Sequence, residues 1–98
     1  MTITKNRQDA KLTVELEGRL DTVSAPEFEA VVKNELNGVA DLILDFKKLQ
    51  YTSSAGLRVI LLAQKTMNKQ GSMILKNVSE DVMEVFEMTG LADLLTIE

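Results

Sequence analysis

The apolar residues of this chain follow two periods, and the change from one to the other marks out the expected secondary structure. In residues 11–18 apolar and polar side chains alternate strictly, which predicts a half-buried strand. The apolar members are Leu12, Val14 and Leu16. Residues 1–5 alternate more weakly and predict a short first strand. The polar residues 6–10 are expected to form the turn of an antiparallel hairpin.

After residue 20 the apolar period becomes helical. Ser24 and Glu27 have capping-box spacing, and Pro26 lies in the first turn, where a missing N–H costs nothing. Asn37-Gly38 predicts the end of this helix. The expected buried stripe is Phe28, Val31, Val32 and Leu36.

The middle of the chain predicts a strand followed by a second helix. The uninterrupted run 42–44 is typical of a strand that is covered on both faces or lies in the middle of a sheet. Residues 51–53 are too few for more than a strand stub, and residues 54–70 have helical spacing that ends at Gly71. The expected stripe of this helix is Leu57, Ile60, Leu61 and Met67.

The last third predicts another strand and another helix. Residues 72–77 have the composition of a buried strand, and Ser79 is placed to cap a helix that ends at Gly90. The remaining eight residues allow one helical turn and a final edge strand. The order is therefore ββαβαβα(β), an α/β fold with a partly parallel sheet in one domain over residues 1–98.

Composition removes several classes of function. The chain of 98 residues has a net charge of −4 and contains neither histidine nor cysteine. Thiolate chemistry, the usual zinc ligand sets and a Ser-His-Asp triad are thereby excluded, and we expect no metal, cofactor or enzyme activity. The acidic balance disfavours direct nucleic-acid binding. With no apolar run long enough for a membrane and no signal-peptide pattern, we expect a cytoplasmic protein.

The turn Thr52–Leu57 is the strongest candidate for function. Three hydroxyl residues precede Gly56 at the expected start of a helix, where unpaired N–H groups and the helix dipole favour an anion. The simplest interpretation is an N-cap, because caps greatly outnumber phosphorylation sites. The alternative is that one hydroxyl accepts a phosphate.

Three segments together favour the second interpretation. The segment 17–32, with Gly18, Leu20, Asp21, Ser24 and Ala25, resembles the opening motif of the STAS family. The segment 42–65, with its hydroxyl-rich turn before Gly56-Leu57, resembles the family's second motif. The ending carried by Phe86, Thr89, Gly90 and Leu91 resembles the C-terminal motif. The resemblance covers nearly the whole chain.

This resemblance implies a mixed sheet of four to five strands with helices mainly on one face. Small stand-alone members are bacterial anti-sigma-factor antagonists. By that resemblance, the unmodified protein binds an anti-sigma factor that is also a serine kinase and so frees a sigma factor. Phosphorylation of one serine ends binding, and a metal-dependent serine phosphatase restores it.

Alignment on Gly56-Leu57 places Ser54 at the family's phosphoacceptor position and makes Ser53 the second candidate. Ser53 itself stands where well-known members carry an aspartate. The expected partner-binding residues are Asp21, Thr22, Ser24, Thr52, Ser53, Ser54 and Gly56. The altered position 53 leaves a second function open, that of a STAS scaffold or accessory subunit of a transport or stress-sensing complex without a phosphoswitch.

Overall fold

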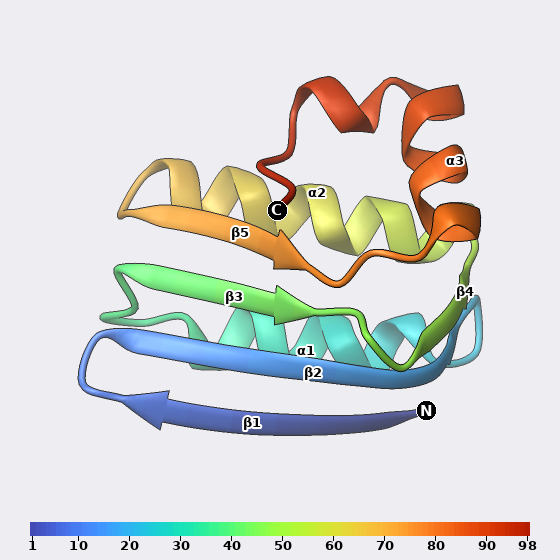
Figure 1. Ribbon diagram of the computed structural model, residues 1–98. Coiled ribbons are helices and arrows are strands. Elements are labelled where there is room, and N and C mark those ends of the chain that lie inside the picture. The colour runs from blue at the N-terminus through green and yellow to red at the C-terminus, as the bar shows by residue number, and fades with distance from the viewer.

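The computed structural model describes residues 1–98 and contains one five-stranded sheet with three α-helices (Figure 1). The elements are β1 (Thr2–Gln8), β2 (Lys11–Leu20), α1 (Ala25–Glu35), β3 (Asp41–Asp45), β4 (Leu49–Thr52), α2 (Ser54–Asn68), β5 (Ser72–Lys76), α3 (Glu80–Thr89) and a short 3-10 helix, η1 (Leu91–Asp93). The strands lie in the order β1-β2-β3-β5, and β4 pairs with the last part of β2. The pairing of β1 with β2 is antiparallel and the other pairings are parallel, which confirms the expected mixed sheet.

Helices α1 and α2 lie behind the sheet in Figure 1, on one of its two faces, and the other face of β1, β2, β3 and β5 is open. The expected placement of the helices is therefore confirmed. Between these two helices and the sheet lies a core of 24 buried apolar residues that also includes side chains of α3. Leu61, expected in the buried stripe of α2, is only half-buried.

The N-terminal hairpin is longer than its sequence pattern indicates. The expectation that residues 6–10 form a turn is wrong, because β1 continues to Gln8 and pairs with β2 as far as Lys11. Asp9 alone adopts a left-handed φ of 56° in the remaining two-residue turn. Polar residues are tolerated in β1 because it is an edge strand whose side chains lie almost entirely in solvent.

The apolar run in β3 is explained by its central position in the sheet rather than by cover on both faces. β3 pairs with β2 on one side and with β5 on the other. Its residue Ile43 is half-buried on the open face, beside the half-buried Ile74 of β5. Strand β5, expected to be a buried strand, has the same alternation of buried and less buried residues.

The C-terminal segment completes the fold. Ser79 caps α3 as expected, since its side chain accepts a hydrogen bond from the N–H of Val82 at 3.2 Å. The expected final strand is reduced to a single parallel bridge between Leu75 and Ile97. None of the helices has both the length and the apolar content needed to cross a bilayer.

Candidate functional site

The parallel pairing of β2 with β4 brings two loops together that are about thirty residues apart in the sequence. Leu20, the last residue of β2, is the register partner of Thr52, the last residue of β4. The N–H of Ser53 then donates to the carbonyl of Leu20 at 2.8 Å. The loop that begins at Asp21 and the start of α2 are consequently neighbours at the same end of the sheet (Figure 1).

The Asp21–Ser24 loop is held by a closed set of hydrogen bonds. One carboxylate oxygen of Asp21 accepts from the N–H groups of Val23 and Ser24, both at 3.0 Å. The Ser24 hydroxyl donates to the carbonyl of Arg19 at 2.7 Å and accepts from the N–H of Asp21 at 2.9 Å. This network fixes the loop before α1 begins.

The expected capping box at Ser24 and Glu27 is wrong. Ser24 has helical backbone angles, φ −93° and ψ −20°, and its side chain makes no cap bond to the helix. The N–H of Glu27 donates instead to the backbone carbonyl of Ser24 at 3.0 Å. Asp21, rather than Ser24, is the side chain that satisfies free N–H groups ahead of α1.

The same network affects the charge of Asp21. The hydrogen bond from the Ser24 N–H lowers the pKa of the Asp21 carboxyl below its usual value, because it stabilises the ionised form. The Ser24 hydroxyl, the Val23 N–H and the nearby charge of Arg19 act in the same direction. At neutral pH the loop therefore presents a carboxylate next to the start of α2.

Helix α2 begins without a side-chain cap, whereas the N–H groups of the Asp21–Ser24 loop are bound by a side chain. Ser53 occupies the N-cap position with an extended backbone, yet its side chain makes no cap bond. Its Oγ is buried and has no hydrogen-bond partner. Ser54, the first helical residue, is exposed. The two candidate serines thus differ in accessibility, and the hydroxyl of Ser54 is the one that another protein can reach.

Two of the expected contact residues are internal. Thr52 is 3% exposed, and Gly56 is buried in the first turn of α2. A Cβ added at Gly56 would lie 2.5 Å from Thr52 Oγ1 and 2.6 Å from Leu20 Cγ. Gly56 therefore lets α2 approach the ends of β2 and β4, and it packs inside the protein rather than on the expected partner-binding surface.

Two features of this end of the sheet were missed in the sequence. The Arg19 guanidinium lies over the ring of Tyr51, with 4.2 Å between its carbon and the ring centroid. Val23 projects from the Asp21–Ser24 loop with 89% of its surface exposed. The register partnership of Arg19 and Tyr51 follows from the β2–β4 pairing, for which the sequence carried no direct signal.

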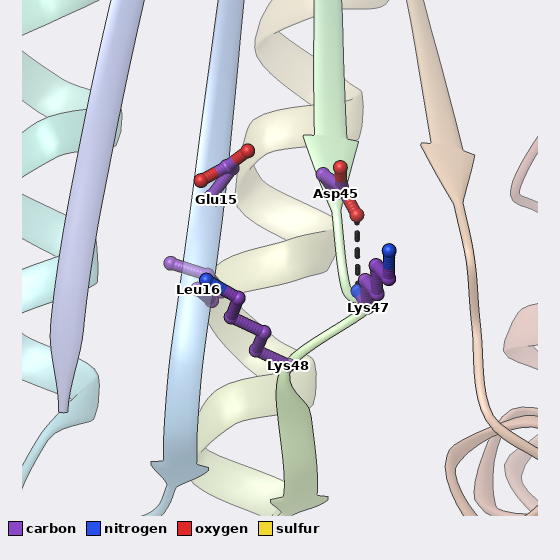
Figure 2. A pocket seen from close by; sticks show the side chains of 5 residues that line it. All are labelled: Glu15, Leu16, Asp45, Lys47 and Lys48. Atoms are coloured by element: carbon purple, nitrogen blue, oxygen red, sulfur yellow. Dashed lines mark hydrogen bonds between the residues drawn. The ribbon is translucent and has the colours of Figure 1, made fainter.

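A separate hollow lies between β2 and the loop that joins β3 to β4 (Figure 2). It is lined by Glu15, Leu16, Asp45, Lys47 and Lys48, and one carboxylate oxygen of Asp45 accepts from the N–H of Lys47 at 3.0 Å. None of its lining residues belongs to the Asp21–Ser24 loop or to the start of α2. The hollow is therefore separate from the candidate site, which is the surface formed by those two segments.

The chain belongs to the STAS domain family, whose model matches residues 2–98. BtrV of Bordetella bronchiseptica, which carries the name of an anti-sigma factor antagonist, is 33% identical over 99% of this chain and 85% of its own length. The anti-sigma-B factor antagonist of Bacillus subtilis is 33% identical over 97% of this chain and 86% of its own.

Two solved structures agree with the fold. The anti-sigma factor antagonist SpoIIAA in its unphosphorylated form superimposes with a TM-score of 0.79 at 19% identity. The match covers 99% of this chain and 87% of SpoIIAA. The phosphorylated form of SpoIIAA, from Bacillus, gives a TM-score of 0.78 at 21% identity and covers 99% of this chain and 91% of that one. The STAS fold expected from the sequence is thereby confirmed.

Proposed function

We propose that this chain is an anti-sigma factor antagonist. Its unmodified form binds an anti-sigma factor that is also a serine kinase, and this binding releases a sigma factor. Membership of the STAS family and the names of relatives that are 33% identical support the role. The observation that carries the proposal is the exposed Ser54 at the uncapped start of α2, beside the rigid Asp21 loop. The chain acts by binding, and we expect it to catalyse no reaction of its own.

Ser54 is the proposed phosphoacceptor. The kinase transfers the γ-phosphoryl group of ATP to Ser54 Oγ, the hydroxyl proton leaves, and ADP is released. A metal-dependent serine phosphatase hydrolyses the ester and returns the chain to its binding form. The second candidate, Ser53, is disfavoured because its Oγ is buried in the folded chain.

The proposed contact surface consists of Asp21, Thr22, Ser24, Ser53 and Ser54. Thr22 and Ser54 are exposed, and Asp21, Ser24 and Ser53 are partly so. Thr52, at the end of β4, and Gly56, within the first turn of α2, support this surface from inside the protein. A phosphate on Ser54 adds about −1.5 to −2 charges to a surface that the partner must desolvate, and this opposes binding.

The effect of a negative charge at position 54 on partner binding can be measured with the purified partner. We expect Ser54→Asp to weaken the complex more than about a hundredfold, equivalent to about 2.7 kcal/mol, as measured by isothermal titration calorimetry. Asn37→Asp adds the same charge at an exposed position after α1, near the opposite end of the sheet, and should bind like the wild type. Equal affinities of the wild type and Ser54→Asp would overturn the phosphoswitch.

Modification is tested separately. The chain is incubated with the kinase and ATP, and the peptides are then mapped by mass spectrometry. We expect phosphate on Ser54, its loss in Ser54→Ala and its retention in Ser53→Ala. Phosphate that survives in Ser54→Ala and disappears in Ser53→Ala would move the acceptor to Ser53.

The neutral Ser53 favours one alternative function. Without a carboxylate beside the acceptor, help in orienting the hydroxyl or the metal-nucleotide complex is lost. The chain would then act as a STAS scaffold or accessory subunit without phosphoswitching. Binding of a partner together with an absence of phosphate on both serines, in the presence of an active kinase, is the result that would favour this alternative.

A further inference from the structure

Arg58 is a second charged group on the face of α2 that carries Ser54. It is exposed and follows Ser54 by four residues, which is about one helical turn. Side chains at this spacing are neighbours on a helix surface, with their Cβ atoms about 5–6 Å apart. Neither of the two salt bridges in the structure involves Arg58, since they join Lys5 to Glu35 and Lys33 to Glu29.

Two charged groups near the start of α2, Asp21 and Arg19, are already engaged. The Asp21 carboxylate accepts hydrogen bonds from its own loop, and the Arg19 guanidinium lies over the Tyr51 ring. The chain neighbours of Ser54 are Ser53 and Ala55, so no carboxylate adjoins it in the sequence. Arg58 is thus a cation without a partner that lies one turn from Ser54 on the same face of α2.

We infer that Arg58 holds the phosphate when Ser54 is phosphorylated, which rests on the proposed function. A guanidinium can donate two parallel hydrogen bonds to a phosphate. The first N–H groups of α2, which no side chain caps, face the same charge from the helix axis. The modification therefore places an ion pair along the first turn of α2 and reverses the sign of charge on that face.

Arg58 would then act on the phosphate of its own chain rather than as a residue that contacts the partner. It is a positioning residue that fixes the phosphate over the start of α2, and it acts in the modified protein before any partner is present. Because the ionised phosphate is the form that pairs best with a guanidinium, Arg58 lowers the second pKa of the phosphate. That pKa is a property of the isolated phosphorylated chain.

The experiment uses the full chain with phosphoserine inserted at position 54 during translation, so that no kinase is needed. Phosphorus NMR follows the phosphate from pH 4 to 9. We expect Arg58→Gln to raise the second pKa of the phosphate by about half a unit, and Arg58→Lys to give an intermediate value. The control is Lys65→Gln, which removes an exposed charge from α2 about 16 Å along the helix axis from Ser54.

A second measurement compares melting temperatures of the phosphorylated and unmodified chains. Phosphorylation should raise the melting temperature more in the wild type than in Arg58→Gln, because the ion pair is lost in the variant. Equal phosphate pKa values in the wild type and Arg58→Gln would overturn the inference, as would an equal shift in Lys65→Gln. These results do not depend on a kinase or a partner, so they separate the failure of this inference from a failure of the proposed function.

Discussion

At the scale of single residues, the site depends on side chains that act within the protein as much as on those that face a partner. Asp21 uses its carboxylate to hold its own loop, and Gly56 allows α2 to pack closely against two strands. The exposed Ser54 lies in the helical turn that contains Gly56, and the Asp21 loop is its neighbour at the same end of the sheet. Substitutions at Asp21 or Gly56 therefore alter the shape of the site even where they remove no contact with another protein.

Gly56→Ala tests the close packing beneath the site. Alanine is the better helix former by about 1 kcal/mol, so propensity alone would raise the free energy of unfolding. The overlap with Thr52 and Leu20 outweighs that gain, and we expect a net loss of about 1–3 kcal/mol in urea denaturation. Ser54→Ala, two residues earlier at an exposed position, should stay within about 0.5 kcal/mol of the wild type. A stabilised Gly56→Ala would contradict the packing argument.

Asp21→Asn tests the electrostatic part of the loop. The native pKa of Asp21 is lowered, so its ionised form stabilises the fold above the unfolded value of about 3.9, and this stabilisation disappears as the pH falls through the native pKa. We expect the wild type to unfold at a higher urea concentration than Asp21→Asn. This difference between the two midpoints should be constant near pH 7 and shrink below about pH 4. Asp93→Asn, at an exposed position in η1, is the matched control. A difference that does not change with pH would refute the role of the charge.

At the scale of elements, the three α-helices begin in three different ways. Helix α3 has a side-chain cap from Ser79, and α1 follows a loop whose N–H groups are taken by Asp21. Helix α2 has a serine at the cap position, but that hydroxyl is buried without a partner. The helix that carries the proposed phosphoacceptor therefore begins with N–H groups that no side chain satisfies.

A pair of serine substitutions measures this difference between the helices. Ser79→Ala removes a working cap and should lower the free energy of unfolding by about 1 kcal/mol. Ser53→Ala removes a buried hydroxyl that has no partner, and it should be neutral or slightly stabilising. Chemical denaturation of both variants under the same conditions provides the comparison. Equal losses for the two would mean that Ser53 also caps its helix in solution.

At the scale of the whole molecule, one core joins the helices to the sheet. The ring of Phe46, which follows β3, lies 6.5 Å from the ring of Phe86 in α3, measured between centroids. Both side chains are fully buried. The radius of gyration of 12.1 Å is close to the value of about 13 Å for a compact chain of 100 residues. Helix α3 should consequently unfold together with the sheet.

Phe86→Leu tests that coupling. We expect a loss of about 1 kcal/mol in a single transition, detected at the same urea concentration by circular dichroism and by the fluorescence of Tyr51, the chain's one tyrosine. Met88→Leu changes an exposed side chain in the same helix and should leave the midpoint unchanged. A midpoint that falls by circular dichroism while the Tyr51 signal keeps its wild-type midpoint would show that α3 unfolds independently.

The sequence was sufficient for most elements because their signals are local. The alternation in β2, the helical spacing in α1 and α2 and the serine cap of α3 each depend on neighbours within a few residues. The errors arose where residues of a pattern found a hydrogen-bond partner outside their own segment. Residues 6–8 are polar but join a strand because β2 pairs with them, and Ser24 leaves its expected cap for the carbonyl of Arg19.

The sequence by itself determined the family motifs, the choice of the turn around Ser54 and the order of the elements except β4. That strand was expected only as a stub over 51–53, but it spans Leu49–Thr52. Tertiary structure decided which residues of that turn are accessible: Ser54 is exposed, the Ser53 hydroxyl is buried, and Gly56 packs inward. The physical reason is that periodicity fixes which side of its own element a residue faces. The surroundings of that side depend on the pairing of β2 with β4, which no pattern within the turn encodes.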